Sequence, residues 1–298
     1  MATFDELVDE TILYLMGMTT LQEQSTYLTA GITASDTEIA VADTAALSRG
    51  LIEIGDELIQ LDSVNAALLN GTIPPYGRGF RGTTAATHSS GDRVVSAPVL
   101  PRATVKRALN SAIESVYPAL WGTETATFAF AAGTESYELP AGTVGVLDLK
   151  WQDYSIASLW HDVRTYSVDV NANTTSFTNG AAVRIGDFVV PGRTVQVTVK
   201  KAPTALSSGS DVFSTVTGLQ SSCEDVIRLG AAQRLVTLMD AAHLQGKSAE
   251  ADFSGASQRN VQTGASLSRS IMQHYQLRLM QESDRLNQLF PVRVRYTR

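Results

Sequence analysis

The chain has 298 residues, of which 44% are hydrophobic and 18% are charged, and its formal net charge is −7. This length is expected to give one large domain or two to three small ones, and the composition is that of a globular protein. The acidic total argues against a general nucleic-acid binder, and no apolar run is long enough to predict a membrane span.

The charges are unevenly distributed along the chain. Residues 1–100 contain thirteen Asp and Glu against four Arg and no Lys, a net charge of −9. Residues 269–298 contain six Arg against one Glu and one Asp, a net charge of +4. Chain ends of opposite charge allow three interpretations: head-to-tail contact between copies, a basic anchoring tail on an acidic body, or uneven solvated surfaces.

The single cysteine, Cys223, excludes a disulfide bond within the chain and favours a reducing compartment. The first ten residues are acidic and lack the basic and apolar regions of a signal peptide. The sequence therefore predicts a soluble protein made in the cytoplasm.

A helix is predicted over residues 4–16, where apolar side chains recur at helical spacing. Thr3 is a candidate N-cap for this helix and Gly17 a candidate stop. The pattern then changes to short alternating runs broken by turn residues, which predict strands between residues 23 and 100. We call this stretch the first β-block.

A second helix is predicted over Thr104–Trp121, with Pro101 suited to its first turn and Pro118 expected to end or kink it. Residues 123–221, the second β-block, contain several strands separated by Gly, Asn and Pro, which suggests a sandwich. The clearest alternation in this block places Val195, Val197 and Val199 on one face. A Ser/Thr/Gly loop is expected from Thr204 to Ser222.

The chain returns to helical patterns after Ser222, which is expected to cap a helix over Glu224–Leu244. Residues 246–264 are polar and predict either a loop or extra helical turns. A long amphipathic helix is predicted over Ser266–Phe290, and Pro291 should end it. The last residues are basic and are expected to be extended.

These elements predict an α+β protein with a helical bundle core, two inserted β-rich modules of barrel or sandwich type, and an extended C-terminal tail. The expected helical core comprises residues 1–22, 101–122 and 222–290, and the tail is residues 291–298. The modules are the first β-block, 23–100, and the second, 123–221. One core is expected to join the apolar stripes of the later helices through Val105, Leu109, Ile113, Val116, Ile227, Leu235 and Met239.

Motifs that suggest catalysis have structural explanations. Gly77–Gly82 matches G-x-G-x-x-G, but no strand precedes it and no helix is expected after it, so a glycine-rich corner is favoured over a phosphate site. The four histidines are scattered without metal-ligand spacing, and His88 is expected to bond a nearby turn carbonyl. Asp56 and Glu57 are adjacent on a strand pattern and should face opposite ways, which disfavours joint acid–base chemistry.

Two further groups bear on chemistry. Cys223 lies where a helix begins, which favours a lowered thiol pKa, although a small buried or capping role is the simpler interpretation. Arg78, Phe80 and Arg81 combine basic and aromatic side chains in an acidic region, and they predict an intersubunit contact.

Residues 51–95 contain, in order, a GDE strand at Gly55–Glu57, an RG…GT turn at Arg78–Thr83, a histidine at position 88 followed by glycine, and a closing strand. This order resembles a β-module of tailed-bacteriophage virion proteins. The outline of helices and inserted β-blocks resembles the head–tail connector (adaptor) proteins of those phages. The likeness also rests on the N-terminal ELVDETILYL, the middle ALNSAIESVYPALW and the terminal LNQLFPVRVRYTR.

The resemblance implies a structural, non-enzymatic protein without cofactors in the virion neck, assembled in the host cytoplasm. It implies a ring of twelve copies under the portal, with the portal protein and a tail or head-completion (stopper) protein as partners. DNA would pass through the lumen without sequence-specific binding. The residues expected to contact the portal are Arg285, Phe290, Pro291, Arg293, Arg295, Tyr296 and Arg298.

Two alternatives remain open from the sequence. A tail or baseplate protein of the same virion also contains the GDE and RG…GT module, but a tube protein should be largely β. A carbohydrate-active β-sandwich enzyme would need carboxylates and aromatic side chains clustered in one cleft.

Overall fold

The computed structural model describes residues 2–17, 23–251 and 257–291, without the side chains between 238 and 267. The chain contains helices and antiparallel sheets, so the α+β class is confirmed. It divides into two compact units. The N-terminal unit is Val8–Leu109, and the C-terminal unit combines Met1–Leu7 with Asn110–Arg298.

The first helix, α1 (Phe4–Met16), begins as the sequence predicts. The hydroxyl of Thr3 accepts the N–H of Glu6, while the Glu6 carboxylate accepts the N–H of Thr3 at 2.8 Å, which forms a capping box. The segment before α1 also pairs with a distant loop of the C-terminal unit, because the N–H of Phe4 donates to the carbonyl of Asp211.

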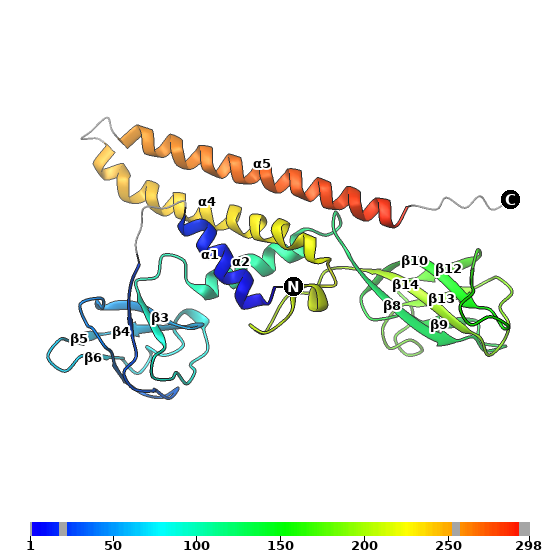
Figure 1. Cartoon of the computed structure of the whole chain (residues 1–298), viewed down its shortest axis with the longest axis horizontal. Coiled ribbons are helices and arrows are strands. Elements are labelled where there is room, and N and C mark those ends of the chain that lie inside the picture. The colour runs from blue at the N-terminus through cyan, green and yellow to red at the C-terminus, as the bar shows by residue number, and fades with distance from the viewer. Residues whose placement is uncertain (1, 18–22, 252–256, 292–298) are drawn as a thin grey trace. The chain divides into compact units, whose positions relative to one another are not determined.

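The first β-block contains two antiparallel sheets (Figure 1). The four-stranded sheet has the order β1 (Gln24–Tyr27), β7 (Arg93–Ser96), β3 (Gly50–Ile54), β4 (Glu57–Leu61). The three-stranded sheet has the order β2 (Glu38–Ala40), β6 (Asn70–Thr72), β5 (Ser63–Asn65).

A single apolar core serves both sheets of the first β-block and includes Leu28, Ile39, Val41, Ile52, Ile54, Ile59, Leu61, Ile73 and Val94. Burial of these side chains supplies the main stabilisation of a small β-unit. No sheet in the described residues closes on itself, so the barrel form expected for the β-modules is wrong.

The second helix, α2 (Arg102–Ser115), starts and ends earlier than predicted. It starts at Arg102 because the carbonyl of Pro101 accepts the N–H groups of Thr104 and Val105. It ends before Pro118, as expected of a residue without an N–H group. The expected stripe is buried at Val105, Leu109, Ala112, Ile113, Val116 and Leu120.

The second β-block also has two antiparallel sheets (Figure 1). One has the order β11 (Trp160–Asp162), β10 (Thr143–Gln152), β14 (Thr194–Lys201), β8 (Gly122–Ala129). The other has the order β12 (Tyr166–Asp169), β13 (Ala182–Ile185), β9 (Ser136–Glu138). Both contribute to one core, and Val195, Val197 and Val199 are fully buried in it, which confirms the predicted alternation of β14.

The region after β14 is more helical than predicted. A short helix, α3 (Phe213–Thr217), lies within the expected loop, and a 3-10 turn, η2 (Ser221–Cys223), precedes α4 (Glu224–Ala251). The last helix is α5 (Ser257–Leu289), which begins nine residues earlier than predicted and ends before Pro291. Ile227 and Leu235 are buried as expected, while the side chain of Met239 lies outside the described residues.

Within the C-terminal unit, α4 lies close to α5 and to the last part of α2, Asn110–Ser115. A Cβ placed on Gly230 of α4 would lie 3.0 Å from the Tyr275 ring of α5 and 3.3 Å from the Ala112 methyl of α2. A side chain at this position would force Tyr275 or Ala112 to shift by a few tenths of an ångström, so the absence of a Cβ permits the close approach of the three helices here. The guanidinium of Arg234 on α4 also donates to the Ser115 hydroxyl on α2 at 2.8 Å.

Candidate functional site: a buried charge network in the first β-block

The GDE motif forms the turn between β3 and β4. Gly55 has φ = +56°, a left-handed conformation that glycine adopts readily, and Ile54 pairs with Glu57 across the two-residue turn. The side chain of Asp56 is 54% exposed and that of Glu57 is fully buried. The two carboxylates face opposite ways, as predicted, so they do not form a catalytic acid pair.

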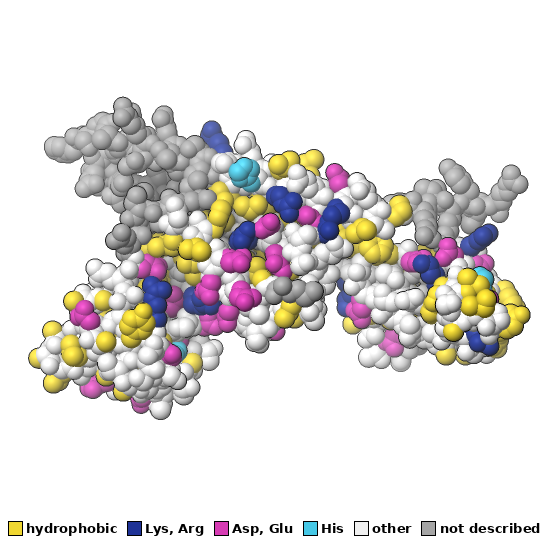
Figure 2. Space-filling view, viewed as in Figure 1, with side chains coloured by type: hydrophobic (Ala, Val, Ile, Leu, Met, Phe, Trp, Pro, Cys, Tyr) yellow, Lys and Arg dark blue, Asp and Glu magenta, His cyan; other side chains and the backbone are white. Residues whose placement is uncertain are grey.

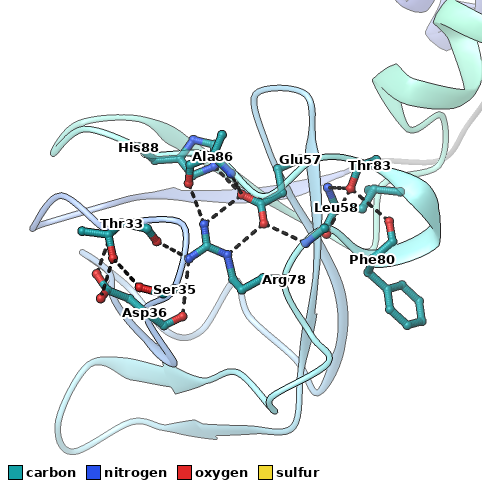
Figure 3. Close-up of polar contacts among 11 residues, drawn as sticks. Thr33, Ser35, Asp36, Glu57, Leu58, Arg78, Phe80, Thr83, Ala86 and His88 are labelled. Carbon is teal, nitrogen blue, oxygen red and sulfur yellow. Dashed lines mark hydrogen bonds and ion pairs between the residues drawn. The ribbon is translucent and has the colours of Figure 1, made fainter.

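The Glu57 carboxylate is the centre of a buried network (Figure 3). Its Oε1 accepts hydrogen bonds from Arg78 Nε at 2.8 Å and from the Gly79 N–H at 2.9 Å. Its Oε2 accepts from Arg78 Nη2 at 2.9 Å and from the Ala86 N–H at 3.1 Å, and lies 2.9 Å from His88 Nε2. The pair of bonds from Arg78 has the two-pronged geometry that makes guanidinium–carboxylate contacts strong.

The guanidinium of Arg78 also binds backbone carbonyls of two other loops. Its Nη2 donates to the carbonyl of Ala86 at 2.7 Å, and its Nη1 donates to the carbonyls of Thr33 and Asp36. One side chain thus joins the strand end at Glu57, the loop at residues 33–36 and the extended segment at residues 86–88 (Figure 3). Because Arg78 binds backbone carbonyls of separate loops as well as a buried carboxylate, it has an architectural role.

The glycine-rich segment around Arg78 is a corner, as the sequence predicts. Gly79 and Gly82 have φ values of +59° and +78°, and a Cβ on Gly77 would lie 2.7 Å from the carbonyl oxygen of Gln60. The only helical structure here is the 3-10 turn η1 (Phe80–Gly82), which is too short to present a helix dipole to a phosphate.

Thr83, the threonine of the RG…GT motif, connects the glycine-rich corner to β4 through its hydroxyl group. The Thr83 hydroxyl accepts the N–H of Leu58 at 3.1 Å and donates to the carbonyl of Phe80 at 3.0 Å. It therefore supplies an acceptor for a backbone N–H group of β4, an edge strand of the sheet.

His88 differs from the sequence prediction. Its backbone forms a two-way bridge with Ile32, at 2.9 Å in each direction, and its ring contacts Glu57 instead of a turn carbonyl. The reason is that the bridge to Ile32 turns the imidazole inward, toward the buried carboxylate, where the ring is 8% exposed.

The electrostatics of Glu57 indicate a group that is ionised at neutral pH. Burial alone would raise the pKa of its carboxyl, but hydrogen bonds from Arg78, Ala86, Gly79 and His88 lower it to about 2. A carboxylate that stays ionised at neutral pH and has both oxygens occupied is not suited to general acid–base catalysis.

The expected intersubunit role of Arg78 is corrected by this geometry. Its side chain is 9% exposed and its donors are bound within the chain, so it is not presented to a neighbouring copy. Phe80 is half-buried and Arg81 is exposed, with the Arg81 guanidinium 5.9 Å from the Phe80 ring centre. Phe80 and Arg81 remain predicted intersubunit contacts.

A second polar cluster ties the start of α4 to α5. The Ser222 hydroxyl, expected to cap α4, donates instead to Glu282 at 2.8 Å. Arg285 donates to the same carboxylate at 2.9 Å and also binds Gln220. Arg285, one of the expected portal contacts, is therefore engaged within the chain although 43% of its side chain is exposed.

The other expected portal contacts lie at or beyond the end of α5. Phe290 packs against Trp121 with ring centres 5.5 Å apart, and Pro291 is exposed. Arg293, Arg295, Tyr296 and Arg298 are outside the described residues.

Cys223 is fully buried beside this cluster. Burial, together with the nearby Glu282 charge, raises the pKa of its thiol to about 11. The buried role that the sequence favours is confirmed, and desolvation outweighs the lowering of the thiol pKa that a position at the start of a helix could give.

An exposed apolar surface on the second β-block was not predicted. Figure 2 shows hydrophobic side chains gathered over this block. The exposed hydrophobic side chains in the loops of this block include Tyr154, Ile156, Leu159 and Phe188, the last at 84% exposure. Apolar surface of this kind is typical of a contact site for another protein.

The loop that carries three of these side chains is ordered by Asp153. Its Oδ1 accepts the N–H groups of Ser155 and Ile156 at 2.7 and 3.2 Å, and its Oδ2 contacts His161 at 2.7 Å. Hydrogen bonds from His161 and Ser155 hold the pKa of Asp153 well below its usual range. The loop therefore presents its apolar side chains on a fixed turn.

No protein-family model matches the chain, and no curated protein matches it at a significant level. Among the residues that the structure describes, no group of three or more His, Cys, Asp or Glu is arranged to hold a metal ion. No described helix is long and apolar enough to cross a membrane.

Proposed function

We propose that this chain is a structural protein of a tailed-bacteriophage particle, a head–tail connector that forms a ring under the portal and joins the capsid to the tail. The observation that carries the proposal is that the motif residues form hydrogen bonds inside the first β-block. Glu57, Thr83 and His88, which match the phage module, form an internal scaffold together with Arg78. A motif of this kind serves architecture and not turnover.

The order of the elements supports the same proposal. Helices α1, α2, α4 and α5 alternate with the two β-blocks in the way that the connector outline implies. We propose that these helices form the bundle core and that the β-blocks are modules inserted into it, the second with a sandwich form. The ring would have twelve copies and would leave a lumen through which DNA passes without sequence-specific binding.

The proposed partners are the portal protein, a tail or head-completion protein, and further copies of the chain. The portal contact is assigned to the end of α5 and the basic segment 291–298. The exposed apolar loops at Tyr154–Leu159 and Phe188 are assigned to the protein on the tail side, because ordered apolar loops bury well against a fixed partner. The location is the virion neck, after assembly in the host cytoplasm.

The alternative is a tail or baseplate protein of the same particle. The described residues contain long helices, among them α4 and α5, beside the strands, which favours a connector over a largely β tube protein. A carbohydrate-active enzyme is disfavoured by the engagement of Glu57, whose oxygens accept four hydrogen bonds from Arg78, Gly79 and Ala86.

Deletion of residues 291–298 tests the portal assignment. The truncated chain keeps Phe290 on Trp121, so its helical content and melting temperature should match those of the full chain. Its binding to purified portal rings, followed by co-sedimentation, should be lost. The matched control is Phe188→Ser, which should leave portal binding intact and reduce binding to the tail-side protein. Normal portal binding by the truncated chain would refute the assignment.

A further inference from the structure

A second buried carboxylate, Glu53, lies in the N-terminal unit away from the Glu57 network. Glu53 is on β3, the strand between β7 and β4, and pairs with Val95 and Leu58. Its strand neighbours Ile52 and Ile54 belong to the apolar core, so Glu53 points to the other face of the sheet. There it is only 6% exposed.

The partner of this carboxylate is the start of α2. Glu53 Oε1 accepts the backbone N–H of Arg102, the first residue of α2, at 2.6 Å. The free N–H groups at a helix start need such acceptors, and the helix dipole offsets only part of the cost of a buried negative charge there. Glu53 thus caps α2 from a strand that is 49 residues earlier in the chain.

A neighbouring carboxylate holds the chain just before the helix. Glu23 Oε1 accepts the N–H of Val99 at 2.8 Å. The segment Ala97–Pro101 connects β7 to α2. Glu23 therefore hydrogen-bonds this segment at Val99, and Glu53 hydrogen-bonds the first residue of the helix, Arg102. We call this arrangement the joint between the first β-block and α2.

The side chains around the joint are strongly charged. Arg102 Nε donates to Asp56 at 3.2 Å, Lys106 Nζ donates to the same carboxylate at 2.6 Å, and Arg102 also pairs with Asp9 of α1. The charged groups that act on Glu53 are thus the Arg102 guanidinium, which favours its ionised form, and the Glu23 and Asp56 carboxylates, which oppose it.

We propose that the joint is a proton-controlled contact, tight when Glu53 is protonated and loosened when Glu53 ionises. In the neutral form the carboxyl stays buried at little cost, and its carbonyl oxygen still accepts the Arg102 N–H. In the ionised form a negative charge is buried near Glu23 and Asp56, and opening the joint to water relieves this penalty. The inference concerns the chain alone and goes beyond the proposed place in a virion.

The direction of the pH dependence follows from the effects that raise and lower the pKa of Glu53. Burial raises its pKa from 4.5 to about 7, against the lowering effects of the Arg102 N–H and charge. A raised pKa contributes stability that is present below pH 4.5 and is lost as the pH rises through about 7. If the open joint restores the ordinary value, the opening equilibrium constant rises about 30-fold between pH 5.5 and 8.5.

Amide hydrogen exchange of the full chain measures this opening in peptides that cover Val99–Val105. After correction for intrinsic exchange, the wild type should show an increase of about 30-fold in opening between pH 5.5 and 8.5. Glu53→Gln keeps the acceptor oxygen but cannot ionise, so its opening should be independent of pH and about tenfold lower than that of the wild type at pH 5.5, where the open wild-type form is already mostly ionised. The matched control, Asp62→Asn, removes an exposed carboxylate and should behave as the wild type.

Two results would overturn the proposal: an equal pH dependence in Glu53→Gln and the wild type, or no dependence in the wild type. A second measurement does not require the variant to fold. The carboxyl ¹³C signal of Glu53 in the wild-type chain, labelled at glutamate, should titrate with a midpoint near pH 7, and a midpoint near 4.5 would contradict the account.

Discussion

Replacement of Arg78 by alanine should destabilise the N-terminal unit and leave the C-terminal unit intact. The change removes both hydrogen bonds to Glu57 and the donors to the carbonyls of Thr33, Asp36 and Ala86. Breaking a buried ion pair from one side costs about 3–5 kcal/mol. We expect about 3 kcal/mol, the low end, because Glu57 keeps three other contacts.

The tryptophans make the assay selective. Trp121, Trp151 and Trp160 all lie in the C-terminal unit, so their fluorescence does not report on Val8–Leu109. Urea titration of Arg78→Ala should leave the tryptophan transition unchanged. Hydrogen exchange in peptides from β3, β4 and β7 should increase by about two powers of ten, since each 1.4 kcal/mol is a factor of ten.

The matched control is Arg81→Ala, an exposed arginine in the same corner, which should cost less than about 0.5 kcal/mol. The double variant Arg78→Ala with Glu57→Gln should recover part of the loss, because it no longer leaves a buried carboxylate without its cation. Equal exchange rates in Arg78→Ala and Arg81→Ala would refute the assignment of Arg78 to the interior.

Three further predictions concern acid stability, the helical core and the thiol. The Glu57 pKa of about 2 lies below its ordinary value of 4.5, so its ionisation contributes stability that is present above pH 4.5 and is lost as the pH falls through about 2. Glu57→Gln should therefore make the acid unfolding of the N-terminal unit less steep over that range, as measured by hydrogen exchange. Ile113→Ala should cost about 2–5 kcal/mol in the tryptophan-monitored transition, whereas the exposed Leu277→Ala should cost little. Cys223 should react with an aromatic disulfide reagent only as the protein unfolds, and rapid reaction of the native chain at pH 8 would contradict its burial.

Local signals in the sequence were sufficient for much of the fold. The glycine-rich corner with Gly79 and Gly82 and the alternation of β14 each depend on a few adjacent residues, and each is confirmed. These features follow from backbone sterics and side-chain periodicity, which act over short distances along the chain.

The network itself was not predictable in this way. Arg78 and His88 are 21 and 31 residues from Glu57, and only the folded chain brings them together. An acidic neighbourhood suggested that Arg78 paired with another subunit, but a single buried glutamate accounts for the pairing within the chain. Cys223 shows the same limit, because burial by distant elements reversed the pKa direction that its local position favoured.

The apolar loops of the second β-block illustrate a third limit. Ile156 and Leu159 look like core residues in the sequence, since periodicity does not tell an exposed loop from a short buried strand. The signal that was present is Asp153 followed by Ser155, a pairing typical of a turn stabilised by an aspartate side chain.

Negative-stain imaging of the purified chain with its candidate portal protein tests the central proposal most directly. The proposal predicts a ring of copies stacked coaxially on the portal, and the loss of these stacked particles when residues 291–298 are deleted. Portal rings that remain bare at saturating concentrations of a well-folded chain would contradict the connector role.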